Sequence, residues 1–496
     1  MKIPSVLPQV KALLEQGNAH FIDGRLLKHG NTYLEVYNPA DEQMIACLRN
    51  ATTREVDLAV HSAARAFART WKRFSPQARQ QCLLNLAQAL AAHREELAQI
   101  EALCGGKLID TARSEVDMSC AFLRHFAGCA AHIVGEHPAQ VSLPETAASQ
   151  CIGFTRREPL GVVAAVTPWN FPIMIAIWKI GAALACGCTI VVKPSEYTPL
   201  SILRIAQIAH EEAGLPAGVF NVINGNGASG EALVSHALVN KISFTGSMRT
   251  GASIGQVAVR DNLKRFTLEL GGKNPAAFFA DVDPEAAVDG IILAGLQHQG
   301  QVCAAAERFY VHKSLLEPVL EHLSERLGHL RIGAPLDPAS QFGPLANRPH
   351  FEKILGCFDT ARYEGDEIIC GGCRVGQQGF FVEPTVIRAR SRESSLMHQE
   401  TFGPILTFLP FDSDSELLEL MNDTPYGLTA SLWTKDIGRA MRLVPEINAG
   451  TVWVNTHNAL DPALPFGGMK GSGMGREFGN AFIEAYTELK TVVMNV

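Results

Sequence analysis

The chain has 496 residues, of which 47% are hydrophobic and 19% are charged, and its formal net charge is -7. This length exceeds one ordinary core, so we expect two or three domains, and the composition excludes a disordered or fibrous protein. The charge is spread along the chain without a basic run, which argues against a nucleic-acid partner.

The N-terminal stretch MKIPSVLPQVKALLEQG has no continuous apolar run before a small-residue cleavage site, so no secretory signal is predicted. Without such a signal, the twelve cysteines of the chain favour free thiols in a reducing cytoplasm. Cys370 and Cys373 have the spacing of a zinc or redox pair, but no second pair follows and the intervening Gly-Gly suits a turn. We therefore predict no metal site and a cytoplasmic protein.

Two amphipathic helices are predicted over residues 56–71 and 76–104, with Ser75 as an N-cap and Pro76 in the first turn. Further along, residues 173–192 form a long apolar run that resembles a membrane span. Gly187 interrupts this run and a β-branched stretch follows, so we predict a buried helix and a short buried strand instead, and no membrane association.

Strands and helices alternate from residue 161 to 270. The predicted strands are GVVAAV, TIVVK, GVFNVI, KISFTG and RFTLEL, with helices over 173–186, 199–213, 229–238 and 248–259. A second alternation covers residues 284–460, with strands RFYVHK, FFVEPTVI, ILTFLPF, SLWTK and GTVWVN. This pattern predicts an α/β fold with two doubly wound parallel sheets and a ligand beyond the carboxyl ends of the strands.

The stretches CIGFTRREP and ELKTVVMNV are strand-like but have no obvious place in either sheet, and we expect them to pair across a subunit interface. The predicted division is 1–130 with 159–269 for the first domain, 270–475 for the second, and 131–158 with 476–496 for a small β segment that supports oligomerisation.

A glycine motif, Gly225-Asn-Gly227-Ala-Ser-Gly230, lies between a predicted strand and helix and matches the dinucleotide fingerprint GxGxxG. No acidic residue follows about 20 residues later at the end of the next strand, where the ribose partner is expected. Gly246 and Ser247 are equally able to offer backbone donors to an anion, so both sites remain open.

Four polar residues follow strands or lie in Gly- and Pro-rich turns, where side chains reach a cleft: Asn170, Glu269, Cys303 and Glu400. Their motifs, TPWNFP, LELGGKNP, GQVCAA and ETFGP, together with KPSE, FTGS and PFGG, resemble the aldehyde dehydrogenase superfamily in order and approximate spacing. The resemblance extends from residue 21 to residue 479.

This resemblance implies that Cys303 attacks an aldehyde to form a thiohemiacetal, whose oxygen Asn170 and the Cys303 N–H stabilise. Hydride transfer to NAD would leave a thioester, which Glu269 would hydrolyse by activating water. Lys179 and Glu477 match a pair that relays protons from Glu269 in this family.

The resemblance also implies an NAD site, with NADP as a possible alternative. Its residues would be Trp169, Lys193, Ser195, Glu196, Gly246, Ser247, Glu400 and Phe402. The Glu196 carboxylate would favour NAD, because it accepts hydrogen bonds from a ribose 2′-hydroxyl and repels a 2′-phosphate.

The expected substrate tunnel is apolar and is formed by Phe171, Met174, Trp178 and Phe466. It favours an apolar or aromatic aldehyde, and GTVWVNTHNALDPALPFGGMK most resembles the phenylacetaldehyde dehydrogenase subgroup. Asp461 leaves open an amino or quaternary ammonium aldehyde, an aliphatic aldehyde is a further alternative, and a cofactor-independent thiol esterase is a rival function.

His298 and Glu307 depart from the residues common in the family. Both flank the nucleophile, and we expect them to alter the tunnel. The family also implies a homo-oligomer, either a dimer or a tetramer built from dimers.

Overall fold

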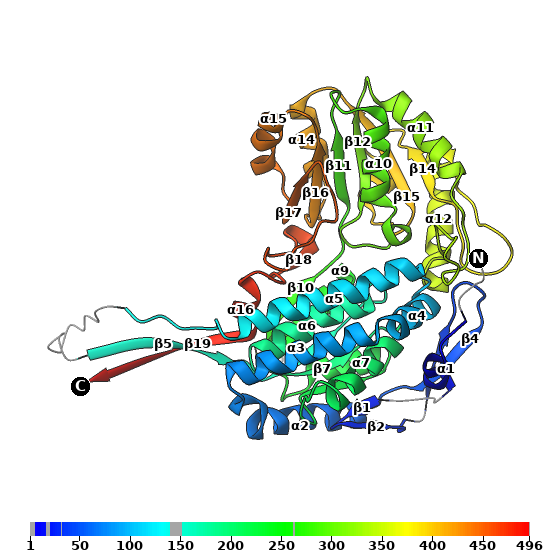
Figure 1. The fold of residues 1–496 in the computed structure, drawn as a ribbon. Coiled ribbons are helices and arrows are strands. Elements are labelled where there is room, and N and C mark those ends of the chain that lie inside the picture. The colour runs from blue at the N-terminus through cyan, green and yellow to red at the C-terminus, as the bar shows by residue number, and fades with distance from the viewer. Residues whose placement is uncertain (1–4, 16–19, 31, 139–150, 261–262, 496) are drawn as a thin grey trace.

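A computed structural model describes residues 5–15, 20–30, 32–138, 151–260 and 263–495 (Figure 1). Two large sheets, each covered by helices on both faces, account for most of these residues. Both sheets are mainly parallel, so the predicted α/β fold class is confirmed.

The first sheet has eight strands in the order β18-β10-β9-β6-β7-β8-β1-β2. Its parallel centre consists of β6 (Val162–Val166), β7 (Thr189–Lys193), β8 (Phe220–Ile223), β9 (Lys241–Thr245) and β10 (Arg265–Glu269). These five strands match the predicted ones. The antiparallel edge strands β1 (His20–Ile22), β2 (Arg25–Leu27) and β18 (Gly473–Met474) were not predicted.

Two apolar layers cover this sheet. One contains α3 (Pro76–Ala92), α4 (Arg94–Gly105), α5 (Ile109–Ala130), α6 (Pro172–Ala185) and α7 (Leu200–Glu211). The other contains α2 (Thr53–Arg69), α8 (Gly227–Ser235) and α9 (Met248–Arg260). The helix predicted over 76–104 is divided at His93, which contacts Glu96 and Glu212 through its two ring nitrogens. Helix α5 was not predicted.

The predicted division of residues 173–192 is confirmed, because α6 ends at Ala185 and Gly187, at φ +85°, leads into β7. Among the described residues, no helix combines the length and the apolar character needed to cross a bilayer.

The second sheet has seven strands in the order β13-β14-β15-β12-β11-β16-β17. These are β11 (Asn274–Phe278), β12 (Ala306–His312), β13 (Glu367–Cys370), β14 (Thr385–Arg388), β15 (Ile405–Phe411), β16 (Thr429–Trp433) and β17 (Thr451–Val454). All pairs are parallel except that of the edge strand β13. Strands β11 and β13 were not predicted.

Side chains alternate between the two faces of this sheet, as in Phe309 and Tyr310 of β12. One face packs on α10 (Pro284–Gly295) and α11 (Leu316–Gly328). The other packs on α12 (Arg348–Glu364), α13 (Ser395–His398), α14 (Asp414–Asn422) and α15 (Ile437–Leu443).

The remaining elements are small. Helix α1 (Pro8–Glu15) and the hairpin of β3 (Tyr33–Tyr37) and β4 (Met44–Arg49) lie near the N-terminus. Short 3-10 helices are η1 (Trp71–Arg73), η3 (Gln297–Gly300), η4 (Val444–Glu446) and η5 (Lys470–Ser472).

Strands β5 (Cys151–Pro159) and β19 (Thr487–Asn495) form a separate antiparallel ribbon that projects from the body (Figure 1). Helix α16 (Ala481–Tyr486) leads into this ribbon. The two stretches without a predicted place in either sheet therefore pair with each other. The chain also returns to the first sheet at β18, inside the range 270–475 predicted for the second domain, because the outer edge of β10 pairs with Gly473 and Met474.

Candidate active site

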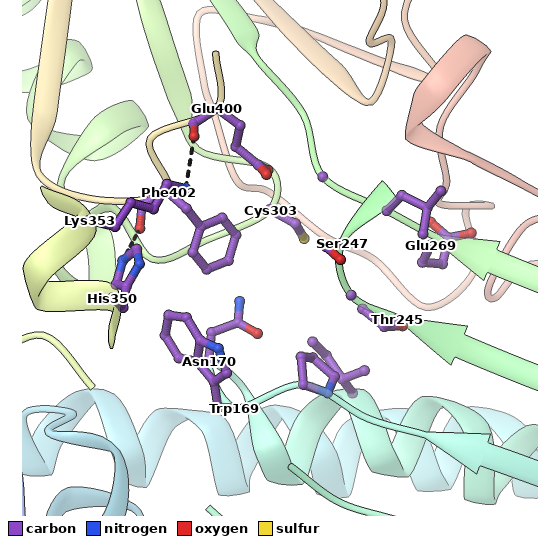
Figure 2. Close-up of a pocket in the computed structure, with 15 residues that line it drawn as sticks. Trp169, Asn170, Thr245, Ser247, Glu269, Cys303, His350, Lys353, Glu400 and Phe402 are labelled. Atoms are coloured by element: carbon purple, nitrogen blue, oxygen red, sulfur yellow. Dashed lines mark hydrogen bonds between the residues drawn. The ribbon is translucent and has the colours of Figure 1, made fainter. Parts of the chain in front are cut away.

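A cavity of about 180 Å³ opens where three parallel strands of the first sheet end (Figure 2). Residues that follow β6, β9 and β10 form one side of it. The other side is formed by residues of the second unit, which is the seven-stranded sheet with its helices and loops, and these residues include Cys303 and Glu400. The fold thus brings together Asn170 and Glu269, at the carboxyl ends of β6 and β10, with Cys303 and Glu400, which precede β12 and β15 of the second sheet.

Cys303 lies on a sharply turned loop between η3 and β12. Two consecutive residues before it, His298 and Gln299, have φ of +48° and +56°, a costly conformation for residues other than glycine. The Asn274 side chain holds the loop by donating hydrogen bonds to the carbonyls of Cys303 and Ala305, each at 2.8 Å. Side chains from β11 therefore fix the backbone that presents the thiol.

Asn170 lies just before α6 and is buried. Its side-chain Nδ2 donates one hydrogen bond to the carbonyl of Gln301, at 2.9 Å. This bond ties the amide to the loop that carries Cys303. Because an amide nitrogen has two protons, the second proton is available to an oxygen bound in the cavity.

Glu269 is the last residue of β10, and its side chain is buried. Neither carboxylate oxygen has a hydrogen-bond partner within the protein. Burial, and then the charge of Glu477, raises the pKa of Glu269 well above its usual value. A buried carboxyl with unused oxygens next to a thiol is suited to accepting a proton from a ligand or a water.

Lys179 on α6 forms a buried ion pair with Glu477, with 2.8 Å between Nζ and Oε1. The family-derived pairing of these two residues is thus present in the structure. Their charges act on Glu269 in opposite directions, since Glu477 raises its pKa and Lys179 lowers it. The pair explains how a charge is retained inside an otherwise apolar helix.

Glu400 and Phe402 line the same cavity from the second unit. The Glu400 carboxylate accepts a hydrogen bond from the Gly272 N–H at 2.9 Å, and burial followed by the charge of Glu307 raises its pKa to about 7. The Phe402 ring meets Trp169 edge-on, with 5.5 Å between centroids. The Glu400, Phe402 and Trp169 side chains therefore narrow the cavity on the side opposite Glu269 (Figure 2).

A second cavity, of about 530 Å³, continues from the first along the ends of β6, β7 and β9. Both cavities share Trp169, Gly246 and Ser247, and the second is also lined by Lys193, Ser195, Glu196, Gly227 and Gly230. Lys193 lies 3.8 Å from Glu196 at its far end. The predicted NAD-site residues thus line one continuous hollow. Its lining combines charged, polar, aromatic and glycine residues, as suits a dinucleotide.

Glycines from both alternatives left open by the sequence line this second cavity. A side chain at Gly230 would approach Lys193 Cδ to 3.4 Å, so α8 packs closely on that lysine. Gly246 lies where the two cavities meet, next to Trp169.

The residues expected along a substrate tunnel lie elsewhere. Phe171, Met174, Trp178 and Phe466 are buried and line neither cavity. They belong to an apolar cluster against which Val302 and Cys303 pack from the other side, and Phe122 and Phe478 complete its aromatic part. The role of these four residues in a substrate tunnel stays a prediction. The aromatic side chains around them suit that role.

Sequence reasoning missed three polar residues that line the first cavity: Thr245, His350 and Lys353. Lys353 Nζ donates to the carbonyl of Glu400 at 2.9 Å, and His350 Nε2 lies 2.8 Å from the carbonyl of Phe402 (Figure 2). Both residues lie in the first two turns of α12. The other site residues were recognised because they follow strands or lie in Gly- and Pro-rich turns, and a helix lacks that signal. Thr245 directly precedes Gly246 and was within reach of the FTGS motif.

The two departures from the family pattern have different positions. His298 is buried against Phe171, with 5.3 Å between ring centroids, so it does border the expected tunnel. Glu307 does not; its carboxylate faces Lys273 and the backbone of residues 401–402. The expectation that Glu307 alters the tunnel was wrong, because successive side chains of β12 point to opposite faces.

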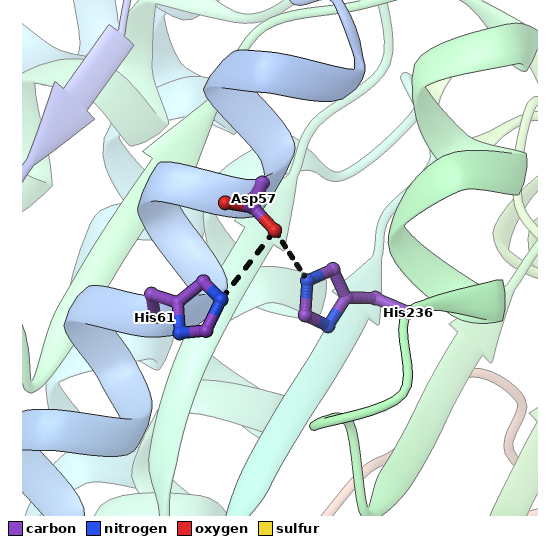
Figure 3. A group of neighbouring side chains, drawn as sticks. All are labelled: Asp57, His61 and His236. Carbon is purple, nitrogen blue, oxygen red and sulfur yellow. Dashed lines mark hydrogen bonds and ion pairs between the residues drawn. The ribbon is translucent and has the colours of Figure 1, made fainter.

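Asp57, His61 and His236 form the group, among the described residues, whose ligand atoms are close enough to share a metal ion (Figure 3). His236 Nε2 lies 3.2 Å from Asp57 Oδ1, while its Nδ1 accepts the Leu238 N–H at 3.2 Å. This arrangement is a hydrogen-bonded surface cluster.

Comparisons with known proteins show which family the chain resembles over nearly its whole length. The sequence profile described as "Aldehyde dehydrogenase family" matches residues 27–492. The chain is 44% identical to the phenylacetaldehyde dehydrogenase of Pseudomonas fluorescens over 466 residues, which cover 93% of this chain and 92% of that protein. It is 40% identical to the 4-trimethylaminobutyraldehyde dehydrogenase of Homo sapiens over 468 residues, 93% of each chain. The solved NAD+ complex of an aldehyde dehydrogenase from Bacillus cereus is 37% identical, with a TM-score of 0.96 and full coverage (100%) of both chains.

Proposed function

The chain belongs to the aldehyde dehydrogenase family, and from this premise we propose that it oxidises an apolar or aromatic aldehyde, such as phenylacetaldehyde, to its carboxylic acid with NAD. The observation that carries the proposal is the meeting of Cys303, Asn170 and Glu269 around one cavity that continues into the hollow lined by Lys193 and Glu196.

Cys303 is the nucleophile. Its thiol must lose a proton to attack the aldehyde carbon, and the unpartnered oxygens of Glu269 on the same cavity are suited to receive that proton. The product of this attack is a thiohemiacetal on the Cys303 sulfur.

Asn170 stabilises the oxygen that becomes negative in this step. Its amide is held by the Gln301 carbonyl, so the free N–H does not need to be oriented during the reaction. A preorganised donor of this kind typically contributes about 10²–10³-fold in rate.

Glu269 acts a second time in hydrolysis of the thioester. A carboxylate that accepts a proton from water generates the attacking hydroxide, and the Lys179–Glu477 pair close behind it tunes its charge. In this proposal, the proton that Glu269 accepts moves on to the buried Lys179–Glu477 pair, which frees Glu269 to act again.

The second cavity supports NAD binding. Thr245 Oγ1 is buried beside Gly246 and has no hydrogen-bond partner within the protein. A buried hydroxyl of this kind is suited to a hydrogen bond with a bound ligand. Bound NAD supplies the hydride acceptor. Glu196, half exposed at the end of this cavity, would accept hydrogen bonds from the adenosine ribose and disfavour a 2′-phosphate.

The aromatic cluster behind Cys303 supports the substrate class. Phe171, Trp178 and Phe466 are buried, and Asp461 is exposed and accepts the Ala463 N–H, so no charge from Asp461 points into the cluster. The similarity to 4-trimethylaminobutyraldehyde dehydrogenase keeps a quaternary ammonium aldehyde as the alternative substrate.

The decisive experiment follows NADH absorbance with phenylacetaldehyde, a long alkanal, succinic semialdehyde and an aminoaldehyde, each with NAD or NADP. We expect the highest kcat/KM for phenylacetaldehyde with NAD, and no activity in Cys303→Ser. A preference for the aminoaldehyde would replace the aromatic substrate, and absence of NADH with every aldehyde would contradict the proposed reaction.

We further propose that the β5–β19 ribbon joins two copies of the chain. It projects from the body and exposes Ile152, Leu489 and Val493, apolar side chains suited to a contact between subunits. Light scattering after gel filtration should give a dimer or a tetramer. The twelve free cysteines support a reducing, cytoplasmic location.

A further inference from the structure

The Glu307 carboxylate is buried behind the segment that carries Glu400 and Phe402. Its Oε2 accepts hydrogen bonds from Lys273 Nζ at 2.6 Å, from the Thr401 N–H at 2.8 Å and from the Thr401 hydroxyl at 2.9 Å. Its Oε1 accepts the Phe402 N–H at 2.7 Å. Both oxygens are therefore engaged, and the charge is balanced by Lys273.

The segment 400–402 needs such support because its conformation is unfavourable. Phe402 has φ of +60°, in the left-handed region that residues other than glycine avoid. Such a conformation persists only where the surroundings hold it. Glu307 holds the two N–H groups of Thr401 and Phe402, which fixes the peptide units 400–401 and 401–402 directly before the strained residue.

The other side of the segment is held by its carbonyls. Lys353 donates to the carbonyl of Glu400, and His350 contacts that of Phe402. Lys353 and His350 themselves line the cavity, whereas Glu307 and Lys273 lie behind it. Glu307 thus acts on the cavity through residues 400–402 and does not reach the cavity itself.

Lys273 also connects this support to the end of the first sheet. The preceding residue, Gly272, donates its N–H to the Glu400 carboxylate at 2.9 Å. At Gly271, a side chain would come within 2.1 Å of Glu400 Oε1, so the backbone approaches that carboxylate closely. Gly272 thus holds the Glu400 carboxylate, and Glu307, paired with Lys273, holds the backbone that follows it.

We propose that Glu307 is a positioning residue for the cofactor: through Thr401 and Phe402 it sets the place of Glu400 and Phe402, and thereby the affinity for NAD. The inference rests on the proposed NAD-dependent reaction. It assigns Glu307 no part in the chemistry of the Cys303 thiol.

The test compares NAD binding with a reaction of Cys303 that needs no cofactor. NAD affinity is measured by calorimetry without aldehyde, and thiol acylation by p-nitrophenyl acetate without NAD. Glu307→Gln keeps the shape of the side chain but places an NH₂ where one N–H acceptor was. We expect NAD to bind at least about tenfold more weakly, as for loss of one hydrogen bond to a charged group, with acylation within about twofold of the parent protein.

Asp366→Asn is the matched control. Asp366 is a buried carboxylate of the same unit that accepts the Arg390 N–H at 2.8 Å and the Ser394 hydroxyl at 2.6 Å, and it lines neither cavity. This variant should lower thermal stability and leave NAD affinity unchanged. Equal weakening of NAD binding in both variants would show a general effect of lost stability and overturn the inference.

Thr401→Val provides a second, milder variant in case Glu307→Gln does not fold. It removes only the hydroxyl bond to Glu307, and we expect NAD binding to weaken by about fivefold. Unchanged NAD affinity in a folded variant overturns the positioning role. If the parent protein itself binds no NAD, the proposed reaction fails as well, which separates the two outcomes.

The pH profile of NAD binding gives a readout that a purely structural role would not move. Burial and then the Glu307 charge raise the pKa of Glu400 to about 7, and Lys353 and Lys273 act in the opposite direction. Loss of the Glu307 charge should therefore lower the pKa of Glu400 and move the midpoint of the profile to lower pH. An unshifted midpoint in folded Glu307→Gln counts against the inference.

Discussion

Cys303 and Glu269 line the same cavity, and burial, followed by the charge of Glu269, raises the pKa of the Cys303 thiol to about 12. The thiol is therefore protonated in the free enzyme at neutral pH. Since the thiolate is the nucleophile, the resting enzyme is protected from adventitious alkylation, and the attack on the aldehyde needs a base.

The first prediction concerns this thiol. Below its pKa the thiolate fraction grows about tenfold for each pH unit, so alkylation of Cys303 by iodoacetamide should keep accelerating from pH 8 to pH 10. Mass spectrometry of the peptide that contains Cys303 measures this rate, with Cys303→Ser as the blank. A plateau in the alkylation rate near pH 8.5 would mean that the pKa of the Cys303 thiol is not raised.

Glu269→Gln should slow the later turnovers much more than the first. The variant keeps the cavity's shape but cannot take a proton from water, so a burst of NADH should precede a steady rate that is about 10²–10⁴-fold lower. Because the pKa of Glu269 is raised, the parent's steady rate should increase with pH as this carboxyl ionises, and that increase should vanish in the variant. Rapid-mixing absorbance distinguishes the phases; equal loss of both would leave Glu269 with thiol activation alone and contradict its role in hydrolysis.

Asn170→Ala should lower kcat by about 10²–10³-fold, because the oxygen of the thiohemiacetal loses its side-chain donor. Asn221→Ala is the control, since Asn221 is also buried and donates to a carbonyl, that of Gly218 at 2.7 Å, but lines neither cavity. Steady-state rates of both purified variants decide the matter. A rate loss in the control as large as in Asn170→Ala would refute a specific role.

Lys179→Met should destabilise the fold by about 3–5 kcal/mol, because Glu477 remains buried without its partner. The double variant Lys179→Met with Glu477→Leu should recover much of this loss. Urea unfolding measures the difference, and an exposed pair, Arg326 with Asp289, gives the reference: Arg326→Met should cost less than about 1 kcal/mol. A similarly small effect at Lys179 would show that water reaches the pair.

Glu196→Gln should reduce the preference for NAD. The variant retains a hydrogen-bond acceptor for the ribose but no longer repels a 2′-phosphate, so kcat/KM for NADP should rise relative to that for NAD by about tenfold, the effect of roughly 1.4 kcal/mol. Glu231, which lines the same cavity, provides a charge control in Glu231→Gln. The same ratio in Glu196→Gln and the parent protein would place the ribose elsewhere.

Much of the fold was predictable because its central strands are short, buried apolar runs that end in turns. Gly187, for example, separates α6 from β7 as expected, since its left-handed φ ends the helix. The edge strands β1, β2 and β18 were not predictable, because two or three residues carry too little pattern and their pairing depends on distant partners.

The candidate site shows the same division. Asn170, Glu269, Cys303 and Glu400 each lie in a motif, and turns after strands of the first sheet meet turns before strands of the second. His350 and Lys353 belong to a helix whose position near Glu400 depends on the packing of the second unit. Glu307 was misplaced because it is close to Cys303 in sequence, while the pleat of β12 turns its side chain toward Lys273.

The Lys179–Glu477 pair also bears on how the chain is made. The two residues are 298 positions apart, which corresponds to about 15–60 s of synthesis at 5–20 residues per second. During this interval α6 carries an ammonium group with no carboxylate to neutralise it, and burial of an unpaired charge is strongly unfavourable. The first sheet is therefore expected to stay incomplete during synthesis, and α6 should dock fully only after the segment around Glu477 has emerged from the ribosome.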